Sequence, residues 1–184
     1  MDNGTWSYQR FLEGDEEGLV QIISEYRDGL LLYLNGIVGD LTVAEDLTED
    51  TFLKLVLKKP RFSAKSTFKT WLYTIGRNLA LDYLKRRRKT EIPLESCPEI
   101  SDEALALERS YIQQEDKQIL HRALKKLKQE YHQVLWLMYF EGFRCEQAGK
   151  IMGKSTHNIE TLAYRARRAL KQLLHEEGYE YEKL

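Results

Sequence analysis

Residues 145–170 read CEQAGKIMGKSTHNIETLAYRARRAL, and this pattern predicts a helix-turn-helix. Gly149 provides a small residue where two helices would touch, and Gly153, four residues later, tolerates the positive φ that the turn needs. Either Ser155 or Thr156 can cap the second helix. Apolar contacts are expected on both sides of the turn, at Ala148, Met152, Ile159 and Leu162.

The second helix of such a unit commonly lies in the major groove of DNA, with its first residues against the base edges. The side chains expected to face the bases are Thr156, His157, Asn158, Glu160 and Thr161. Those expected to contact phosphates are Tyr164, Arg165, Arg167 and Arg168. The alternative is an ordinary helical hairpin with a solvated basic end.

A second basic segment lies about seventy residues earlier. The net formal charge is only −1, yet residues 60–90 contain nine Lys or Arg against one acid, and residues 144–175 contain seven against two. The rest of the chain is therefore acidic. Two separate basic segments on an acidic chain suit contact with two stretches of nucleic acid.

The first basic segment also carries aromatic side chains. Trp71 and Tyr73 lie close to Lys69, and Arg77 and Asn78 follow. Aromatic rings beside cations suit single-stranded DNA, since unpaired bases stack on the rings while the cations hold phosphates. For Trp71 and Tyr73 the core remains an equal alternative, and Phe68 and Leu72 are expected to be core.

The rest of the chain predicts further helices and no strand. Apolar spacing predicts a helix over 19–37, followed by one from an N-cap at Thr42 to Lys59, and a third starting near Ser66. Further helical patterns cover 105–120 and 124–138. The fold class is therefore all-α: two small helical domains joined by a flexible linker, the second a helix-turn-helix domain. The expected boundaries are 1–90, 91–112 for an acidic linker, and 113–184.

No pattern in the sequence indicates catalysis. The two cysteines, Cys97 and Cys145, lie far apart, and the four histidines show no metal-ligand spacing. No zinc-protease motif, phosphate-binding glycine loop or serine elbow is present, so we expect no catalytic residue, cofactor or metal. Without a signal peptide or an apolar run of about eighteen residues, a cytoplasmic protein without a membrane span is expected.

Three motifs together resemble a known family. Residues 44–54 read AEDLTEDTFLK and residues 68–86 read FKTWLYTIGRNLALDYLKR, and the helix-turn-helix follows. In this order and spacing they look like the small extracytoplasmic-function sigma factors of bacterial RNA polymerase. The resemblance implies binding to core RNA polymerase and promoter DNA, and regulation by an anti-sigma factor. The alternative is a conventional helix-turn-helix regulator that binds DNA without polymerase.

The resemblance also implies roles for individual residues. Those implied to dock on the β′ clamp helices of the polymerase are Asp46, Leu47, Thr48, Glu49 and Phe52. Those implied to open or bind the −10 element are Lys69, Trp71, Tyr73, Arg77, Asn78, Asp82, Arg86 and Arg87. The second domain would bind the β flap and the −35 element, the latter through Ser155, Thr156, His157, Asn158, Glu160, Thr161, Tyr164, Arg165 and Arg168. Thr48, Ala148, Gly149 and Glu160 depart from the residues usual in the family.

Overall fold

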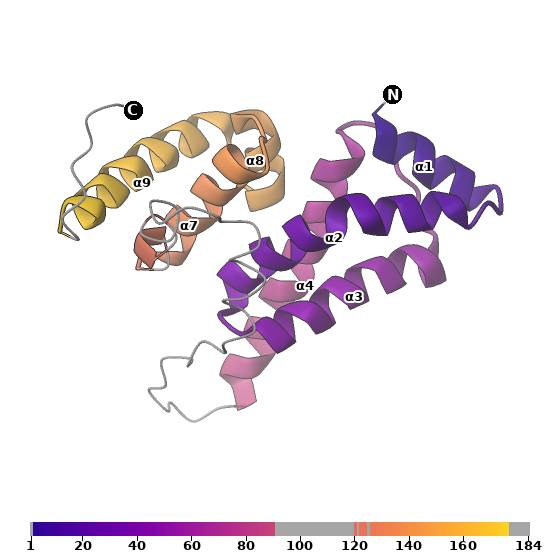
Figure 1. The fold of residues 1–184 in the computed structure, drawn as a ribbon, viewed down its shortest axis with the longest axis horizontal. Helices are drawn as coiled ribbons and strands as arrows, with labels where there is room; N and C mark the ends of the chain where they lie inside the picture. The colour runs from indigo at the N-terminus through magenta and orange to yellow at the C-terminus, as the bar shows by residue number, and fades with distance from the viewer. Residues whose placement is uncertain (1, 91–119, 121, 125, 177–184) are drawn as a thin grey trace. The chain divides into compact units, whose positions relative to one another are not determined.

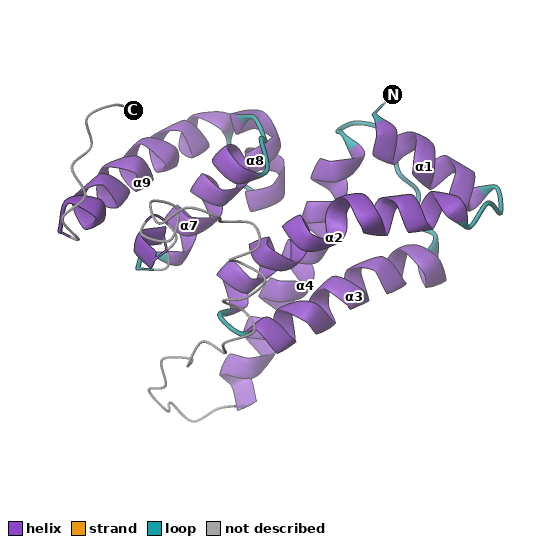
Figure 2. Ribbon diagram, viewed as in Figure 1, coloured by secondary structure: helices purple, strands orange, loops and turns teal. Residues whose placement is uncertain are grey.

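The computed structural model describes residues 2–90, 120, 122–124 and 126–176. Within these ranges the chain forms helices and no strand, which confirms the all-α prediction (Figure 2). The chain divides into two compact units, the first built mainly on residues 2–90 and the second mainly on those from 120 onward. The predicted linker at 91–112 lies outside the described residues, as does all but the end of the helix predicted at 105–120.

The N-terminal unit consists of four helices. They are α1 (Asn3–Leu12), α2 (Glu17–Val38), α3 (Leu41–Lys58) and α4 (Phe68–Thr90). Helix α2 packs against each of the other three (Figure 1). Its apolar residues recur every three or four positions, so they form the buried face that the sequence predicts. The core includes Ile22, Leu30, Leu31, Tyr33, Leu34, Leu55, Phe68, Leu72 and Tyr73.

The junction between α2 and α3 differs from the sequence prediction at its cap. Gly39 ends α2 in the left-handed conformation, with φ of 72°. Asp40, rather than the predicted Thr42, caps α3: its carboxylate accepts a hydrogen bond from Val43 N at 3.1 Å. Aspartate and threonine are both good N-caps. Asp40 takes the cap position because it directly follows Gly39, whose left-handed conformation ends α2.

Helix α1 was not predicted from the sequence. It has only ten residues, of which Tyr8 and Phe11 are buried. Gly18 at the start of α2 allows the two helices to approach closely, because a Cβ there would lie 2.2 Å from the carbonyl oxygen of Ser7. Tertiary contact therefore stabilises α1, as is usual for short helices.

The C-terminal unit contains α7 (Gln129–Leu135), a π-helical turn η1 (Trp136–Phe140), α8 (Cys145–Met152) and α9 (Thr156–Glu176). The single helix predicted over 124–138 is wrong, since a turn precedes Gln129 and the helix continues into η1. Helix α7 packs against α9. No helix in the described part of the chain is long and apolar enough to cross a membrane.

Candidate nucleic-acid and protein interfaces

Helices α8 and α9 form the predicted helix-turn-helix. A Cβ at Gly149 would lie 2.7 Å from the carbonyl oxygen of Lys154, so a larger residue would force the backbone of the turn to move. Lys154 N donates to Gly149 O at 2.9 Å, and Gly153 has φ of 66°. Both glycines therefore have the roles that the sequence assigned to them.

The structure selects one of the two possible caps of α9. Ser155 Oγ accepts a hydrogen bond from Asn158 N at 3.2 Å, and α9 begins at Thr156. Ile159 is buried as predicted, whereas Leu162 is only half-buried and its neighbour Ala163 takes the core position. Small residues at this position allow α9 to pack closely on its neighbours.

The opposite face of α9 is open to solvent over its first two turns. His157 and Glu160 lie 4.0 Å apart, with side chains that are 86% and 59% exposed. Such exposed polar side chains can reach donors and acceptors on base edges. Thr161 is half-buried, and the remaining members of the predicted −35 set are exposed: Ser155, Thr156, Asn158, Tyr164, Arg165 and Arg168.

Sequence reasoning missed a contact beside this face. Arg167 Nη1 donates to the Tyr139 hydroxyl at 3.3 Å, so one expected phosphate contact is hydrogen-bonded within the protein. Tyr139 lies in the π-helical turn and is itself 57% exposed. Nothing in the local pattern around Tyr139 indicates this pair, because it joins residues 28 positions apart.

The first turn of α4 presents an aromatic cluster. The Trp71 ring lies 5.5 Å from Tyr8, 5.2 Å from Phe62 and 5.6 Å from Phe68, measured between ring centroids. Phe68 is fully buried, whereas Trp71 is half-buried. The cluster therefore fixes the position of the Trp71 indole while part of the side chain stays exposed, a combination that suits stacking with an unpaired base.

Tyr73 does not share this position. Its side chain is fully buried, with its ring 5.5 Å from that of Tyr33 on α2. Lys69 Nζ lies over the Tyr73 ring, 5.6 Å from its centroid. This cation–π contact stabilises the position of the lysine. Tyr73 therefore takes the core position that the sequence left open as an alternative, and its side chain is not exposed for stacking on DNA in this structure.

The remaining −10 residues follow the length of α4. Asn78, Asp82 and Arg86 recur every four residues and are exposed. This spacing places them on one face of the helix. Arg77 and Arg87 are half-buried. Burial raises the pKa of the Tyr33 hydroxyl well above its usual value, and the nearby Arg77 guanidinium opposes that rise. Arg77 therefore lies between the core and the exposed face.

The predicted docking residues on α3 divide between the core and the surface. Asp46 and Glu49 are exposed, whereas Leu47, Thr48 and Phe52 are buried. Leu47 therefore belongs mainly to the packing of α3. The Thr48 hydroxyl donates to Ala44 O at 2.7 Å, so its hydrogen bond is made within the helix.

Thr48 and Phe52 nevertheless line a groove between α2 and α3, together with the two exposed acids. The groove has a volume of about 700 Å³, and its other lining residues are Ile23, Arg27, Leu31, Glu45, Asp50, Leu53 and Val56. Leu53 is 50% exposed at this surface. Acids beside apolar side chains form a surface suited to a basic protein partner. The contributions from α2 were not predicted, since they depend on how the helices pack.

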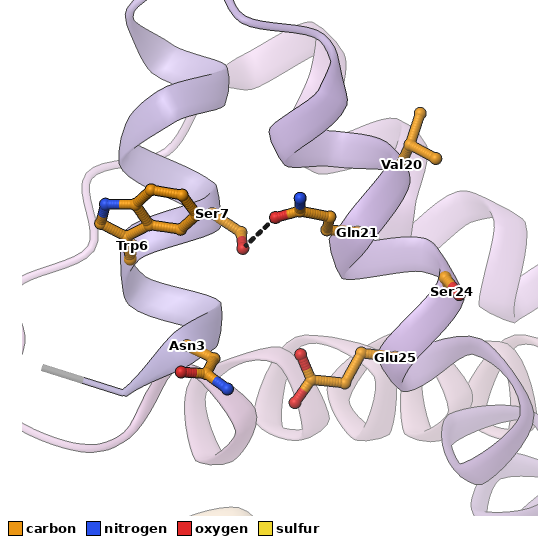
Figure 3. A pocket seen from close by; sticks show the side chains of 7 residues that line it. All are labelled: Asn3, Trp6, Ser7, Val20, Gln21, Ser24 and Glu25. Atoms are coloured by element: carbon orange, nitrogen blue, oxygen red, sulfur yellow. Dashed lines mark hydrogen bonds between the residues drawn. The ribbon is translucent and has the colours of Figure 1, made fainter.

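A second groove lies between α1 and α2, with a volume of about 560 Å³ (Figure 3). Its only hydrogen bond between lining residues runs from Ser7 Oγ to Gln21 Oε1 at 3.0 Å. A glutamine amide is no general base, so this serine is not activated as a nucleophile. The described ranges contain no group of three or more potential metal ligands.

Comparison with known proteins gives both units a counterpart. The Sigma-70 region 2 family matches residues 22–90, and the Sigma-70, region 4 family matches residues 117–170. The sigma factor BldN of Streptomyces coelicolor is 29% identical over 90% of the chain, which spans 64% of BldN's length. The sigma factor YlaC of Bacillus subtilis is 29% identical, with 85% of the chain and 91% of YlaC covered.

A solved structure supports the same relationship. The sigma factor RpoE of Bartonella quintana, in complex with the anti-sigma factor NepR, matches with a TM-score of 0.68 and 26% identity. The match covers 84% of this chain and 95% of RpoE.

The two matched regions define a sigma-70-type transcription initiation factor. Because the relatives that match over most of the chain include sigma factors of the extracytoplasmic-function group, the chain belongs to that group. The region 2 match in the N-terminal unit also favours a sigma factor over the alternative, a conventional helix-turn-helix regulator that binds DNA without polymerase.

Proposed function

We propose that this sigma factor acts in the cytoplasm and binds core RNA polymerase through the groove between α2 and α3. In this proposal the start of α4 opens the −10 element, α9 binds the −35 element, and the C-terminal unit contacts the β flap. The observation that carries the DNA assignments is the exposed face of α9, whose polar and basic side chains project from a helix with a buried apolar face.

The docking proposal rests on the composition of the groove. Asp46 and Glu49 are exposed at its surface, and Phe52 and Leu53 provide apolar contact area. Apolar area supplies affinity, while the acids select a basic partner and accelerate association. The β′ clamp helices are the partner that the family resemblance implies for this surface.

The two DNA contacts use different chemistry. On α9, Arg165 and Arg168 neutralise phosphates of duplex DNA, and His157 and Glu160 face base edges. On α4, the Trp71 ring stacks on a base that has left the duplex, and Lys69 holds a neighbouring phosphate. Binding the displaced base offsets the cost of opening, which is about a few kcal/mol.

The decisive test reverses the charge of the docking surface. In the double variant Asp46→Lys and Glu49→Lys, we expect binding to core polymerase to weaken about 100-fold, because like charges facing each other cost several kcal/mol. Run-off transcription on genomic promoter fragments should fall accordingly. Binding is measured by titrating labelled sigma factor with core enzyme.

A matched control reverses two acids elsewhere. Glu13 and Glu16 are exposed in the connection between α1 and α2, so Glu13→Lys with Glu16→Lys makes the same change of net charge. This control should bind core enzyme as the wild type does. Equal binding by both double variants would contradict the docking proposal.

We also propose regulation by an anti-sigma factor. The support is the matching structure of RpoE, which is bound to the anti-sigma factor NepR. A neighbouring gene product that reduces run-off transcription when added in a 1:1 ratio would support this part of the proposal, and restoration by excess sigma factor would show that the inhibition acts on it.

A further inference from the structure

A single carboxylate joins the beginnings of two helices in the N-terminal unit. Asp2 Oδ1 accepts hydrogen bonds from Thr5 N and Thr5 Oγ1, each at 2.8 Å, and therefore caps α1. Asp2 Oδ2 accepts from Phe68 N at 3.0 Å, and Phe68 is the first residue of α4. Both helix N-termini present unpaired N–H groups and partial positive charge to the same anion.

Packing reinforces the link between these two helices. A Cβ at Gly4 would lie 2.6 Å from Phe68 Cδ1, so α1 and the start of α4 approach as closely as glycine permits. The Tyr8 hydroxyl donates to Pro60 O at 2.8 Å, and its ring contacts Trp71. Burial raises the pKa of Tyr8 to about 12, which keeps this donor protonated.

Helix α4 also has a cap of its own. Thr67 Oγ1 accepts a hydrogen bond from Thr70 N at 3.2 Å, and Thr67 O accepts one from Trp71 N. The first turn of α4 therefore keeps its own capping contacts if Asp2 is removed. What Asp2 adds is a fixed position of that turn relative to α1, whose residues precede the region 2 match that begins at residue 22.

We infer that Asp2 is a positioning residue for promoter opening: by tying α1 to the start of α4, it holds Trp71 and Lys69 where an unpaired −10 base is received. This inference rests on the proposed function of α4. Without the tie, the aromatic cluster can still form, but its orientation at the moment of strand separation is no longer fixed. The expected defect is therefore largest in opening duplex DNA. On DNA that is already open it is small, because the holoenzyme no longer has to offset the cost of strand separation.

The test compares two templates with full-length holoenzyme. Asp2→Ser keeps an oxygen that can cap α1 but has no second oxygen for Phe68 N. The template is a promoter that the wild-type holoenzyme transcribes, used as a duplex and with its −10 element opened by mismatches. We expect open-complex formation on the duplex to fall about five- to tenfold, as loss of one capping bond predicts, and to stay within about twofold on the mismatched template.

Two further variants make the result specific. Glu13 is exposed in the connection between α1 and α2, so Glu13→Ser removes the same charge outside the proposed interfaces and should behave as the wild type does. Tyr8→Phe deletes the bond to Pro60 but keeps the ring contact with Trp71, and should reproduce the duplex-specific defect in weaker form. Asp2→Asn replaces Asp2→Ser when the melting temperature of the Asp2→Ser protein falls below the assay temperature, because asparagine retains the size of the aspartate side chain.

Equal activity of the Asp2 variant and the wild type on duplex DNA would overturn the inference. An equal loss on both templates would overturn it as well, since that result indicates a general defect in folding or polymerase binding. If the wild-type holoenzyme transcribes no promoter fragment at all, the proposed function itself fails. The two failures are therefore distinguishable from the same set of reactions.

Discussion

Helices α4 and α9 are the two long basic helices among the described residues, yet they expose different kinds of side chain. The start of α4 packs its aromatic residues against α1 and α2. Of these aromatic residues, Phe68 and Tyr73 are buried and Trp71 is half-buried. The start of α9 exposes nearly all of its polar residues, with the His157 side chain 86% exposed. Both helices carry a net positive charge, so the sign of the charge alone does not separate their functions.

The difference teaches which form of DNA each helix suits. A rigid, partly buried ring offers a flat surface to an unstacked base but does not fit a base pair in a duplex. Extended polar side chains reach into a groove and read hydrogen-bonding edges that a duplex presents. Substitutions at the start of α4 should therefore weaken binding to single-stranded DNA, and substitutions on α9 should weaken binding to duplex DNA.

The largest effect should come from removing phosphate contacts of α9. In Arg165→Gln with Arg168→Gln, we expect holoenzyme binding to a duplex −35 fragment to weaken about 100-fold at low salt. The slope of log affinity against log salt concentration should decrease in magnitude by about two, since each phosphate contact contributes about 0.9. Fluorescence anisotropy at several salt concentrations measures both quantities.

The control for this variant removes two cations from another part of the same unit. Arg122 and Lys126 are exposed before α7, and Arg122→Gln with Lys126→Gln should leave the salt slope within about 0.3 of the wild-type value. The comparison between the two helices would break if the α9 variant weakened binding to a single-stranded −10 oligonucleotide as much as binding to the duplex.

A smaller effect is expected at Trp71, on binding to single-stranded rather than to duplex DNA. Trp71→Leu should weaken holoenzyme binding to a single-stranded −10 oligonucleotide about tenfold, because base stacking on an aromatic residue contributes about 1–3 kcal/mol. Binding to the duplex −35 fragment should not change. Competition binding with unlabelled oligonucleotides gives the affinities, and thermal unfolding shows whether the aromatic cluster still packs.

Tyr73→Phe is the matched control, since it tests the residue that the structure places in the core. Removal of the buried hydroxyl keeps the ring against Tyr33 and should leave the affinity for the single strand unchanged. A loss as large as that of Trp71→Leu would show that the Tyr73 hydroxyl contacts DNA, and would contradict the division of α4 into a buried and a DNA-binding side.

Local geometry explains which features the sequence predicted. The helix-turn-helix depends on Gly149, Gly153 and the apolar spacing around them, and all of these act within about ten residues. The helix end at Lys59 follows from Pro60 in the same way. Such features can be recognised in the sequence because the physical cause and its effect lie in the same short segment.

The features that were missed depend on contacts between distant segments. Helix α1 is stabilised by packing on α2 and by the bond between Asp2 and Phe68, which are 66 residues apart. Tyr73 and Leu47 carry side chains that suit either a surface or a core, and the neighbouring helix determines which they join. Periodicity places a residue on a face of its helix but does not show what covers that face.

The smallest effect is expected at the cap of α9, where one residue has two predicted roles. Ser155 caps the helix through its hydroxyl, and the family resemblance also places it among the −35 contacts. Ser155→Ala should lower the free energy of unfolding of the C-terminal unit by about 1 kcal/mol. Chemical denaturation monitored by circular dichroism measures this loss.

Ser155→Asn separates the two roles, because asparagine caps a helix as well as serine does but differs in size and in its hydrogen-bonding groups. If capping is the role that matters, Ser155→Asn restores both stability and binding to the −35 duplex. If stability returns while duplex affinity stays low, the Ser155 hydroxyl contacts DNA directly. In that case the surface that binds duplex DNA begins one residue before α9, and its contrast with the packed start of α4 becomes sharper.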